Sequence, residues 1–291
     1  MELFLNSIGF GLVTASILAL AAVGLTLQFG MTNYVNFAYG DFMTLGAYLT
    51  WTLNVGLGWP FWPALFVGAL LMAIPVLFIS QFVLEPFTRR SGPTFHILIV
   101  TFAVSLILSN LILAIWGGDF QNYNIGTDTP INLGPFILSV QQLGIIALAV
   151  TCMVAIHLLL TRTKLGKAMR AISDDKNLAA VTGIDTRRIT TIVWVLSGML
   201  AGLAGGVLAL NVASFDPNVG VTFLFVIFAA VVFGGIGRPY GAMAGALVIG
   251  LVVEVSAVFI PSAYKLDVAF LVLMGVLLVR PDGLMSLFER G

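Results

Sequence analysis

Nine long apolar segments, separated by short polar ones, constrain the fold of this chain more than any other feature. They cover residues 7–29, 38–55, 61–84, 94–116, 136–160, 189–211, 219–235, 240–262 and 265–280. Runs of about 20 apolar residues are typical of membrane helices, because a chain inside lipid must satisfy its backbone polar groups internally. Only 9% of the residues are charged, far below the share in a soluble domain. We therefore expect an all-α polytopic membrane protein.

Two of the nine segments need not cross the membrane completely. The segments 38–55 and 219–235 are short and contain glycine, so either could be a broken or re-entrant helix. We expect about nine transmembrane helices, within a range of about eight to ten. A β-barrel needs alternating segments of about ten residues, which this sequence lacks. Residues 1–291 are predicted to form a single transmembrane domain.

The positions of lysine and arginine predict the orientation, because these residues gather at the cytoplasmic ends of spans. With nine alternating spans and an N-terminus outside, only Lys265 lies on the outer side. The remaining cations all fall inside: Arg89, Arg90, Arg162, Lys164, Lys167, Arg170, Lys176, Arg187, Arg188, Arg238, Arg280 and Arg290. We therefore expect a periplasmic N-terminus and a cytoplasmic C-terminus.

Two hydrophilic loops stand out between the spans. Residues 117–135 form the longest outer loop, which is either a solvated connector or a docking surface for an external partner. Residues 161–188, TRTKLGKAMRAISDDKNLAAVTGIDTRR, form the only large hydrophilic segment and lie on the inner side. We call residues 161–188 the coupling region from here on.

The coupling region is predicted to contain two short helices. Its first helix has one apolar face, with the cations directed away from it: the apolar residues are Leu165, Ala168, Met169 and Ile172, and the cations are Lys164, Lys167 and Arg170. Ser173 is a candidate N-cap for the second helix, with Asp174 and Asp175 in its first turn. Gly183 fits the position after that helix, with Ile184 next, and Asp185 is expected to cap the following span. The segment is either a positively charged connector or an element through which a cytoplasmic subunit transmits movement.

Polar residues within the apolar segments are candidates for a transport pathway, because such groups are costly in lipid and usually face a cavity. Asn33, Asn36 and Asp41 lie in the stretch 30–48, GMTNYVNFAYGDFMTLGAY, and Glu254 lies inside the span 240–262. Residues 30–37 are either an exposed turn or a broken helix beside a cavity, and we favour a gate or pathway lining. Glu254 is either a pathway residue or a neutralised carboxyl bonded to a neighbouring helix.

Glycines at a spacing of four predict close helix contacts. Gly198, Gly202 and Gly206 leave one helix face without side chains, and Gly241 and Gly245 repeat the pattern. In lipid, close approach of two backbones is a main source of helix association. A smooth wall beside a pore is a compatible alternative.

Catalytic and nucleotide-binding motifs are missing from the sequence. It contains no Ser/His/Asp spacing, no pair of histidines at metal-ligand spacing and only one cysteine, Cys152. Gly166 and Lys167 lack the residues that complete a phosphate-binding loop, and GGIGRPYG at 234–241 fits a tight reversal between spans better than a dinucleotide site. We therefore expect no enzyme activity, no metal and no bound cofactor in this chain.

Four segments, taken in order, resemble the branched-chain amino acid ABC transporter permeases of the LivH type. The motif NFAYGDFMTLGAY at 36–48 is similar to one in that family, although Tyr39 stands where histidine is common and Asp41 where glutamate is common. LGKAMRAISDDKNLAAVTGID at 165–185 resembles the cytoplasmic coupling region of the family. The segments 228–254 and 264–285 are similar to its glycine-rich pair of spans and its C-terminal span.

The resemblance implies an importer of several subunits in the inner membrane of a bacterium. Its implied partners are a second permease, two cytoplasmic ATPase subunits that hydrolyse ATP, and a periplasmic solute-binding protein. The implied solutes are leucine, isoleucine and valine, or a relative such as urea or another amide. The implied ATPase-coupling residues are Arg170, Ser173, Asp174, Asp175, Gly183, Ile184 and Asp185. The main alternative is an ion-coupled secondary transporter that works without an ATPase and uses Glu254 as its ion site.

Overall fold

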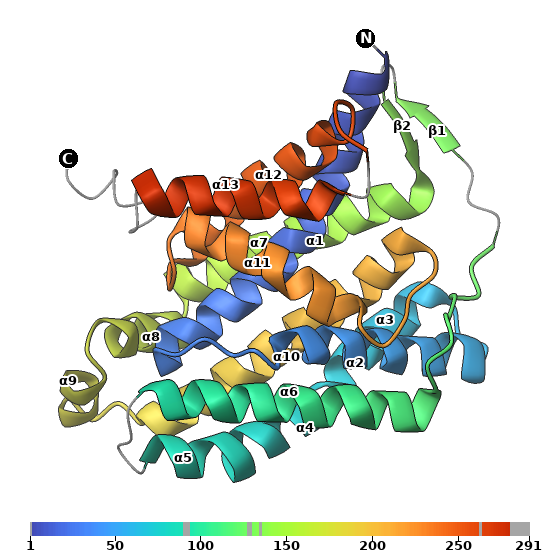
Figure 1. Ribbon diagram of the computed structural model, residues 1–291. Helices are drawn as coiled ribbons and strands as arrows, with labels where there is room; N and C mark the ends of the chain where they lie inside the picture. The colour runs from blue at the N-terminus through green and yellow to red at the C-terminus, as the bar shows by residue number, and fades with distance from the viewer. Residues whose placement is uncertain (1, 90–93, 127–129, 134–135, 262–263, 280–291) are drawn as a thin grey trace. The chain divides into compact units, whose positions relative to one another are not determined.

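The computed structural model describes residues 2–89, 94–126, 130–133, 136–261 and 264–279 (Figure 1). Arg90, Arg280 and Arg290, which contributed to the predicted orientation, lie outside these ranges. The regular secondary structure of the described residues is helical, with one exception. The strands β1 (Pro130–Leu133) and β2 (Phe136–Ser139) form an antiparallel pair, and a single bridge joins Gln121 to Phe215. The predicted helical class of fold is therefore confirmed.

The helices follow the apolar segments closely. They are α1 (Glu2–Thr32), α2 (Tyr39–Trp51), α3 (Phe61–Leu71), α4 (Ala73–Phe78), α5 (Glu85–Arg89), α6 (Thr94–Trp116), α7 (Val140–Arg162), α8 (Lys164–Asp174), α9 (Lys176–Val181), α10 (Thr186–Val212), α11 (Val219–Gly234), α12 (Pro239–Ser256) and α13 (Lys265–Val279). Two π-helical segments extend them: η1 (Thr52–Gly56) continues α2, and η2 (Ile79–Leu84) joins α4 to α5. The chain from α3 to α5 thus forms one continuous helical stretch, which we call the α3–α5 span.

Six helical stretches within the described residues are long and apolar enough to cross a membrane. They are Asn6–Thr32, Phe61–Thr88, Phe95–Trp116, Val140–Arg162, Thr186–Val212 and Pro239–Ser256. The helix Val219–Gly234 is apolar but shorter. Each of the six coincides with a segment that the sequence predicted.

Two predicted span boundaries are wrong. The segment 136–160 begins with β2, and α7 starts only at Val140, because Phe136–Ser139 pair with β1 instead of entering the helix. The segment 240–262 contains a helix that ends at Ser256. Glu254 therefore lies in the last turn of α12 and not in the middle of a span.

The chain packs as two compact units. Unit 1 comprises residues 1–26, 125–153 and 225–291, and unit 2 comprises residues 27–124 and 154–224. The helices α1, α7 and α11 each contribute residues to both units.

The centre of unit 2 is the contact between α2 and α10. A Cβ added to Gly46 would collide with the backbone of Gly202, and one added to Gly205 would collide with the carbonyl of Met43. On a neighbouring face of α10, Gly198 lies against Val76 and Gly206 against Leu65. The glycines of α10 therefore let α2 and the α3–α5 span approach its backbone closely, as is typical of helix packing in lipid.

Unit 1 uses small residues in the same way. A Cβ at Gly250 of α12 would collide with the backbone of Ala15 in α1. Gly245 of the same helix lies against the carbonyl of Ala230 in α11, and Gly234 lies against Gly241. The turn between α11 and α12 is tight because Gly235 and Gly237 both have positive φ angles, of 100° and 84°.

The first part of the loop 117–135 is folded onto unit 2. Tyr123 is buried, donates a hydrogen bond of 3.0 Å to the Ala47 carbonyl, and has its ring centroid 5.2 Å from that of Phe215. Asn54 bonds both the amide and the carbonyl of Asn124. Burial raises the pKa of the Tyr123 phenol well above its ordinary value, so this group remains a neutral donor. Tyr123 is therefore anchored in the core of unit 2, whereas Asn122 and Asn124 beside it are exposed, as expected for a solvated connector.

Candidate functional site

The stretch 30–48 is a break between two helices. The first helix, α1, ends at Thr32, and α2 begins at Tyr39. Asn33 has a left-handed backbone with φ of 55°, and its amide donates to the Phe29 carbonyl at 2.8 Å. Asparagine tolerates this conformation better than most residues and commonly ends helices in this way.

Asn36 connects the two helices across the break. Its side-chain oxygen accepts a hydrogen bond of 3.1 Å from the Ala38 amide at the start of α2. Its side-chain nitrogen donates to Gln28 Oε1 in the last turns of α1, at 3.2 Å. Both side chains are buried, so the pair satisfies polar groups that have no access to water.

Asp41 is a fully buried carboxyl group in the first turn of α2. Ser105 Oγ and Ser109 Oγ, one helical turn apart on α6, each donate to one of its oxygens at 2.5 Å. A helix places residues i and i+4 on the same face, so the two serines form a matched pair of donors. Hydrogen bonds are the condition under which a buried carboxyl group can be retained.

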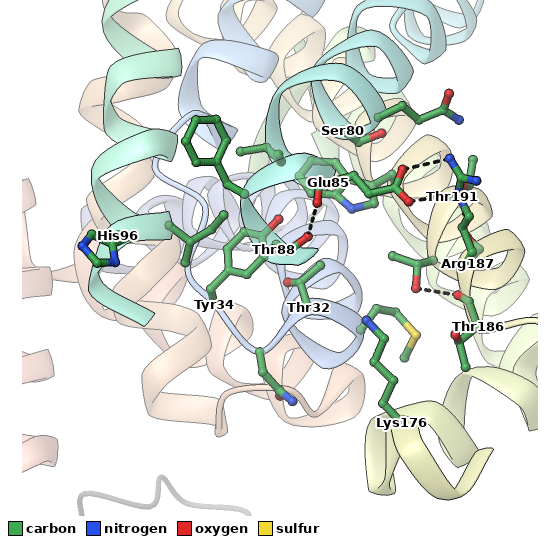
Figure 2. A pocket seen from close by; sticks show the side chains of 18 residues that line it. Thr32, Tyr34, Ser80, Glu85, Thr88, His96, Lys176, Thr186, Arg187 and Thr191 are labelled. Carbon is green, nitrogen blue, oxygen red and sulfur yellow. Dashed lines mark hydrogen bonds and ion pairs between the residues drawn. The ribbon is translucent and has the colours of Figure 1, made fainter. Parts of the chain in front are cut away.

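A polar cavity of about 510 Å³ lies in unit 2, next to the break (Figure 2). It is lined by the end of α1 and the break (Met31, Thr32, Asn33, Tyr34), by η2 and α5 (Ser80, Gln81, Leu84, Glu85, Phe87, Thr88), by α6 (His96, Ile97), by α9 (Lys176) and by α10 (Thr186, Arg187, Thr190, Thr191, Trp194). Asn33 and the coupling region thus contribute to one cavity. Asn36 and Asp41 are not part of its lining.

An ion pair joins two of the helices around this cavity. Arg187 Nε lies 2.9 Å from Glu85 Oε1, and its Nη2 donates to Glu85 Oε2 at 3.2 Å, as the dashed lines in Figure 2 show. The guanidinium group therefore binds both carboxylate oxygens, which is the directional geometry that arginine favours. The exposed fraction of the side chain is 67% for Arg187 and 22% for Glu85.

The first helix of the coupling region is α8. Its buried residues are Gly166, Met169 and Ile172, while Lys164, Lys167 and Arg170 are exposed, in agreement with the predicted face. Gly166 lies directly against the backbone of Leu159 and Leu160, so α8 folds back closely on the end of α7. Thr163 caps the helix by accepting from the Gly166 amide at 3.0 Å.

The predicted cap of the second helix is wrong. Ser173 and Asp174 still belong to α8, and Asp175 is the N-cap of α9. Asp175 Oδ1 accepts from the Asn177 and Leu178 amides at 2.8 and 3.0 Å. Asp175 has an extended backbone, which is the conformation of an N-cap, and its carboxylate complements the helix dipole better than a hydroxyl does.

The end of α9 follows the prediction. Gly183 has φ of 88°, its amide bonds the Ala180 carbonyl, and the Ile184 amide bonds the Ala179 carbonyl, both at 3.1 Å. This is the Schellman arrangement that satisfies the last carbonyls of a helix. Asp185 then caps α10 by accepting from the Arg188 amide at 3.0 Å.

Glu254 has partners on two other helices of unit 1. Thr14 Oγ1 donates to Glu254 Oε1 at 2.9 Å, and Lys265 Nζ lies 2.6 Å from Glu254 Oε2. Side-chain exposure is 15% for Glu254 and 30% for Lys265. The carboxylate therefore joins α12 to α1 and α13 within the unit.

Comparison with known families identifies the chain. Residues 7–279 match the model of the branched-chain amino acid transport system permease component. The chain belongs to this family. It is the permease component of a branched-chain amino acid ABC transport system, a membrane subunit that is not itself catalytic. Permeases of such systems work with ATPase and binding-protein partners.

Individual relatives agree with this assignment. The chain is 31% identical to a probable branched-chain amino acid transport permease protein LivH of Methanocaldococcus jannaschii, covering 94% of this chain and 90% of the relative. It is 28% identical to the high-affinity permease protein LivH of Escherichia coli K12, covering 97% and 96%. Among solved structures, PsaBC from Streptococcus pneumoniae matches with a TM-score of 0.53 at 15% identity, covering 96% of this chain and 94% of that one. That likeness concerns the fold alone.

Sequence reasoning missed several residues that hold the permease site together. Ser105 and Ser109 lie in an apolar span 64 and 68 residues from Asp41, and Glu85 lies 102 residues from Arg187. The spacing of the two serines by four residues was the one signal in the sequence. A single charged residue such as Glu85 carries no comparable signal, because its partner depends on the tertiary fold.

Proposed function

We propose that this permease forms, with a second permease chain, the membrane pathway for leucine, isoleucine and valine or for a related amino acid or amide. Two cytoplasmic ATPase subunits drive it, and a periplasmic binding protein delivers the solute. Family membership supports the class of solute. Tyr39 and Asp41, which differ from the common family residues, are both fully buried in unit 2. Uptake of each radiolabelled solute by the assembled complex tests the choice among them.

The proposed topology has nine spans across residues 1–291. To the six long apolar helices it adds α2 with η1, α11 and α13, which are shorter. The N-terminus is periplasmic, the coupling region and the C-terminus are cytoplasmic, and the membrane is the bacterial inner membrane. The distribution of lysine and arginine supports this orientation.

The coupling region is proposed as the dock of the ATPase, and one observation carries this role. The helix α9 exposes two apolar side chains one turn apart, Leu178 at 63% and Val181 at 85% of their surfaces. Among polar neighbours on a cytoplasmic segment, such a pair is typical of a protein-binding surface. The proposed coupling residues either lie near α9 in the chain or fix its two ends. They are Arg170, Ser173, Asp174, Asp175, Gly183, Ile184 and Asp185.

The break 33–38 is proposed as the moving part of the pathway. Irregular backbone at membrane depth persists only where protein or water covers it, and here Asn33 lines a polar cavity that also contains Lys176 of α9. Movement of the coupling region can therefore reach the break through side chains around one cavity. Asn36 and Asp41 hold the two sides of the break in place.

The first experiment is to tag the chain, extract it gently from its native membrane and identify the proteins that copurify. We expect a stoichiometric ATPase and a second permease-like chain. The variant Leu178→Ser/Val181→Ser should lose the ATPase, whereas Val212→Ser, at the other end of α10 and 44% exposed, should retain it.

The rival function is an ion-coupled secondary transporter. A chain that purifies alone and moves solute when reconstituted with an ion gradient would support the rival and contradict the proposed importer. Glu254 is paired with Lys265 in this structure, so use of Glu254 as an ion site would require that ion pair to open.

A further inference from the structure

We infer that the ion pair between Glu85 and Arg187 transmits movement of the coupling region to the α3–α5 span. The inference rests on the proposed function, since it assumes that an ATPase moves the coupling region. It assigns a role in transport to Glu85 and to Arg187, neither of which is among the individual coupling residues or pathway candidates named above.

Arg187 is placed to receive that movement. It is the second residue of α10 and follows the coupling helices after only a short turn. The turn is held rigidly: Gly183 and Ile184 close α9, and Asp185 caps α10. A displacement of α9 therefore acts on the first turn of α10 with little slack between them.

Glu85 is placed to pass the movement on. It is the first residue of α5 and directly follows the π-helical segment Ile79–Leu84. π-helical turns are rare and are frequently found at functional sites. They also interrupt the regular bonding of a helix and are recognised positions of bending. A pull on Glu85 thus acts at the end of the α3–α5 span where the helix is least regular.

The surroundings of the pair allow the two helices to shift together. The cavity that the pair lines also has hydroxyl groups from both helical stretches. Ser80 and Thr88 belong to the α3–α5 span, and Thr191 belongs to α10 (Figure 2). A polar, roomy cavity admits water, so a shift of the helices need not open a gap between apolar surfaces. The same cavity includes Asn33, which connects the pair to the break.

The chemistry of the pair suits transmission better than stabilisation. Exposed ion pairs contribute little to stability, and Arg187 is 67% exposed. A guanidinium group that binds both oxygens of a carboxylate nevertheless fixes direction as well as distance. Loss of the pair should therefore leave the fold intact while it disconnects the two helices.

The test compares transport with ATP hydrolysis in the reconstituted complex. In Glu85→Gln and in Arg187→Gln, we expect solute moved per ATP to fall about fivefold or more, the size of a typical coupling effect, while the ATPase still copurifies and hydrolyses ATP. The exchange Glu85→Arg/Arg187→Glu should restore at least half of the lost coupling. The control is Arg188→Gln, which removes an exposed cation next to Arg187 in the chain that does not line the cavity and should leave coupling unchanged.

Each outcome has a distinct meaning. Unchanged coupling in both single variants, or an exchange variant as impaired as the single ones, overturns the inference. A parallel loss of expression and ATP hydrolysis in the single variants, without rescue by the exchange, assigns the pair a structural role and also overturns it. Failure of the unmodified chain to copurify with an ATPase contradicts the proposed function itself, independently of these variants.

Discussion

Lys265 forms an ion pair with Glu254 that joins the first residue of α13 to the last turn of α12, with 2.6 Å between Nζ and Oε2. Lys265 is the one cation that the orientation places on the outer side. Its partner is the carboxylate that sequence alone suggested as a pathway residue. The pair therefore gives both residues a role in holding the helices of unit 1 together.

Removal of the cation should cost more stability than neutralisation of the acid. In Lys265→Met, Glu254 loses its cationic partner and retains the bond from Thr14, at a cost of about 1–3 kcal/mol for the unpaired carboxyl oxygen. Glu254→Gln retains an acceptor for Thr14 and should be milder, and the double variant should recover part of the loss. Thermal unfolding of the detergent-purified complex ranks the stabilities of these variants. Equal unfolding midpoints for all of them would contradict the expected ranking.

Glu254→Gln also tests the pathway hypothesis. If the carboxylate lines the pathway, uptake falls while the ATPase still binds. If it only joins helices, uptake follows the amount of folded protein in the membrane. Radiolabelled leucine uptake, divided by the quantity of assembled complex, distinguishes the two.

Asp41→Ala should reduce uptake about tenfold or more, because it removes the carboxyl group that accepts hydrogen bonds from both Ser105 and Ser109. Expression should persist, because Ser105 and Ser109 can bond carbonyls of their own helix instead. Ser105→Ala and Ser109→Ala, which each remove one donor to Asp41, should have intermediate effects. Wild-type uptake by Asp41→Ala would rule out a role for this carboxyl in the gate or pathway.

Asn36→Ala should impair uptake by loosening the break, with a loss of stability of about 1–3 kcal/mol, because it leaves buried polar groups without their partner. The variant removes both the bond from the Ala38 amide and the bond to Gln28. Asn110→Ala is a matched control, because Asn110 is exposed and bonds only the Leu106 carbonyl one turn earlier. Uptake assays and thermal unfolding of both variants provide the comparison, and equal behaviour of the two would disprove a special role for Asn36.

Gly202→Leu should abolish assembly of unit 2, because even a Cβ at this position approaches Met72 Cγ to 2.9 Å and Ala69 Cα to 3.1 Å. Overpacking of this kind costs about 1–3 kcal/mol or more. Gly126→Leu is the control, since Gly126 is exposed and no atom of the described residues lies within 4 Å of its Cβ position. The yield of monodisperse protein after detergent extraction separates the two, and a normal yield of Gly202→Leu would show that this contact is dispensable.

The spans and several helix ends could be predicted because their causes are local. An apolar run fixes a membrane helix by its own composition, and Gly183 and Asp185 act on backbone groups within a few residues of themselves. Ser173 failed as a cap because two acidic residues follow it and the sequence does not say which of the three ends the first helix. The hairpin 130–139 was missed because its second strand is as apolar as the helix that follows it.

The site could be predicted only in part, since its contacts join distant segments. Asn33 became a candidate because it is a polar residue between two apolar spans, and it lines the cavity in the structure. The rest of that cavity is built mostly by residues of other helices. Asp41 was found for the same reason, whereas its two serine donors were not. Glu85 and Arg187 were two charges among others until the fold placed them 2.9 Å apart.

The coupling region carries the caps of its own helices: Thr163 for α8, Asp175 and Gly183 for α9, and Asp185 for α10. Its backbone is therefore ordered before any partner arrives, and association does not have to supply that ordering entropy. For a preorganised surface, little of the interaction free energy is lost on binding. In the proposed complex, a small contact through Leu178 and Val181 is then sufficient to hold the ATPase. The ATPase can also dissociate without unfolding of the coupling region.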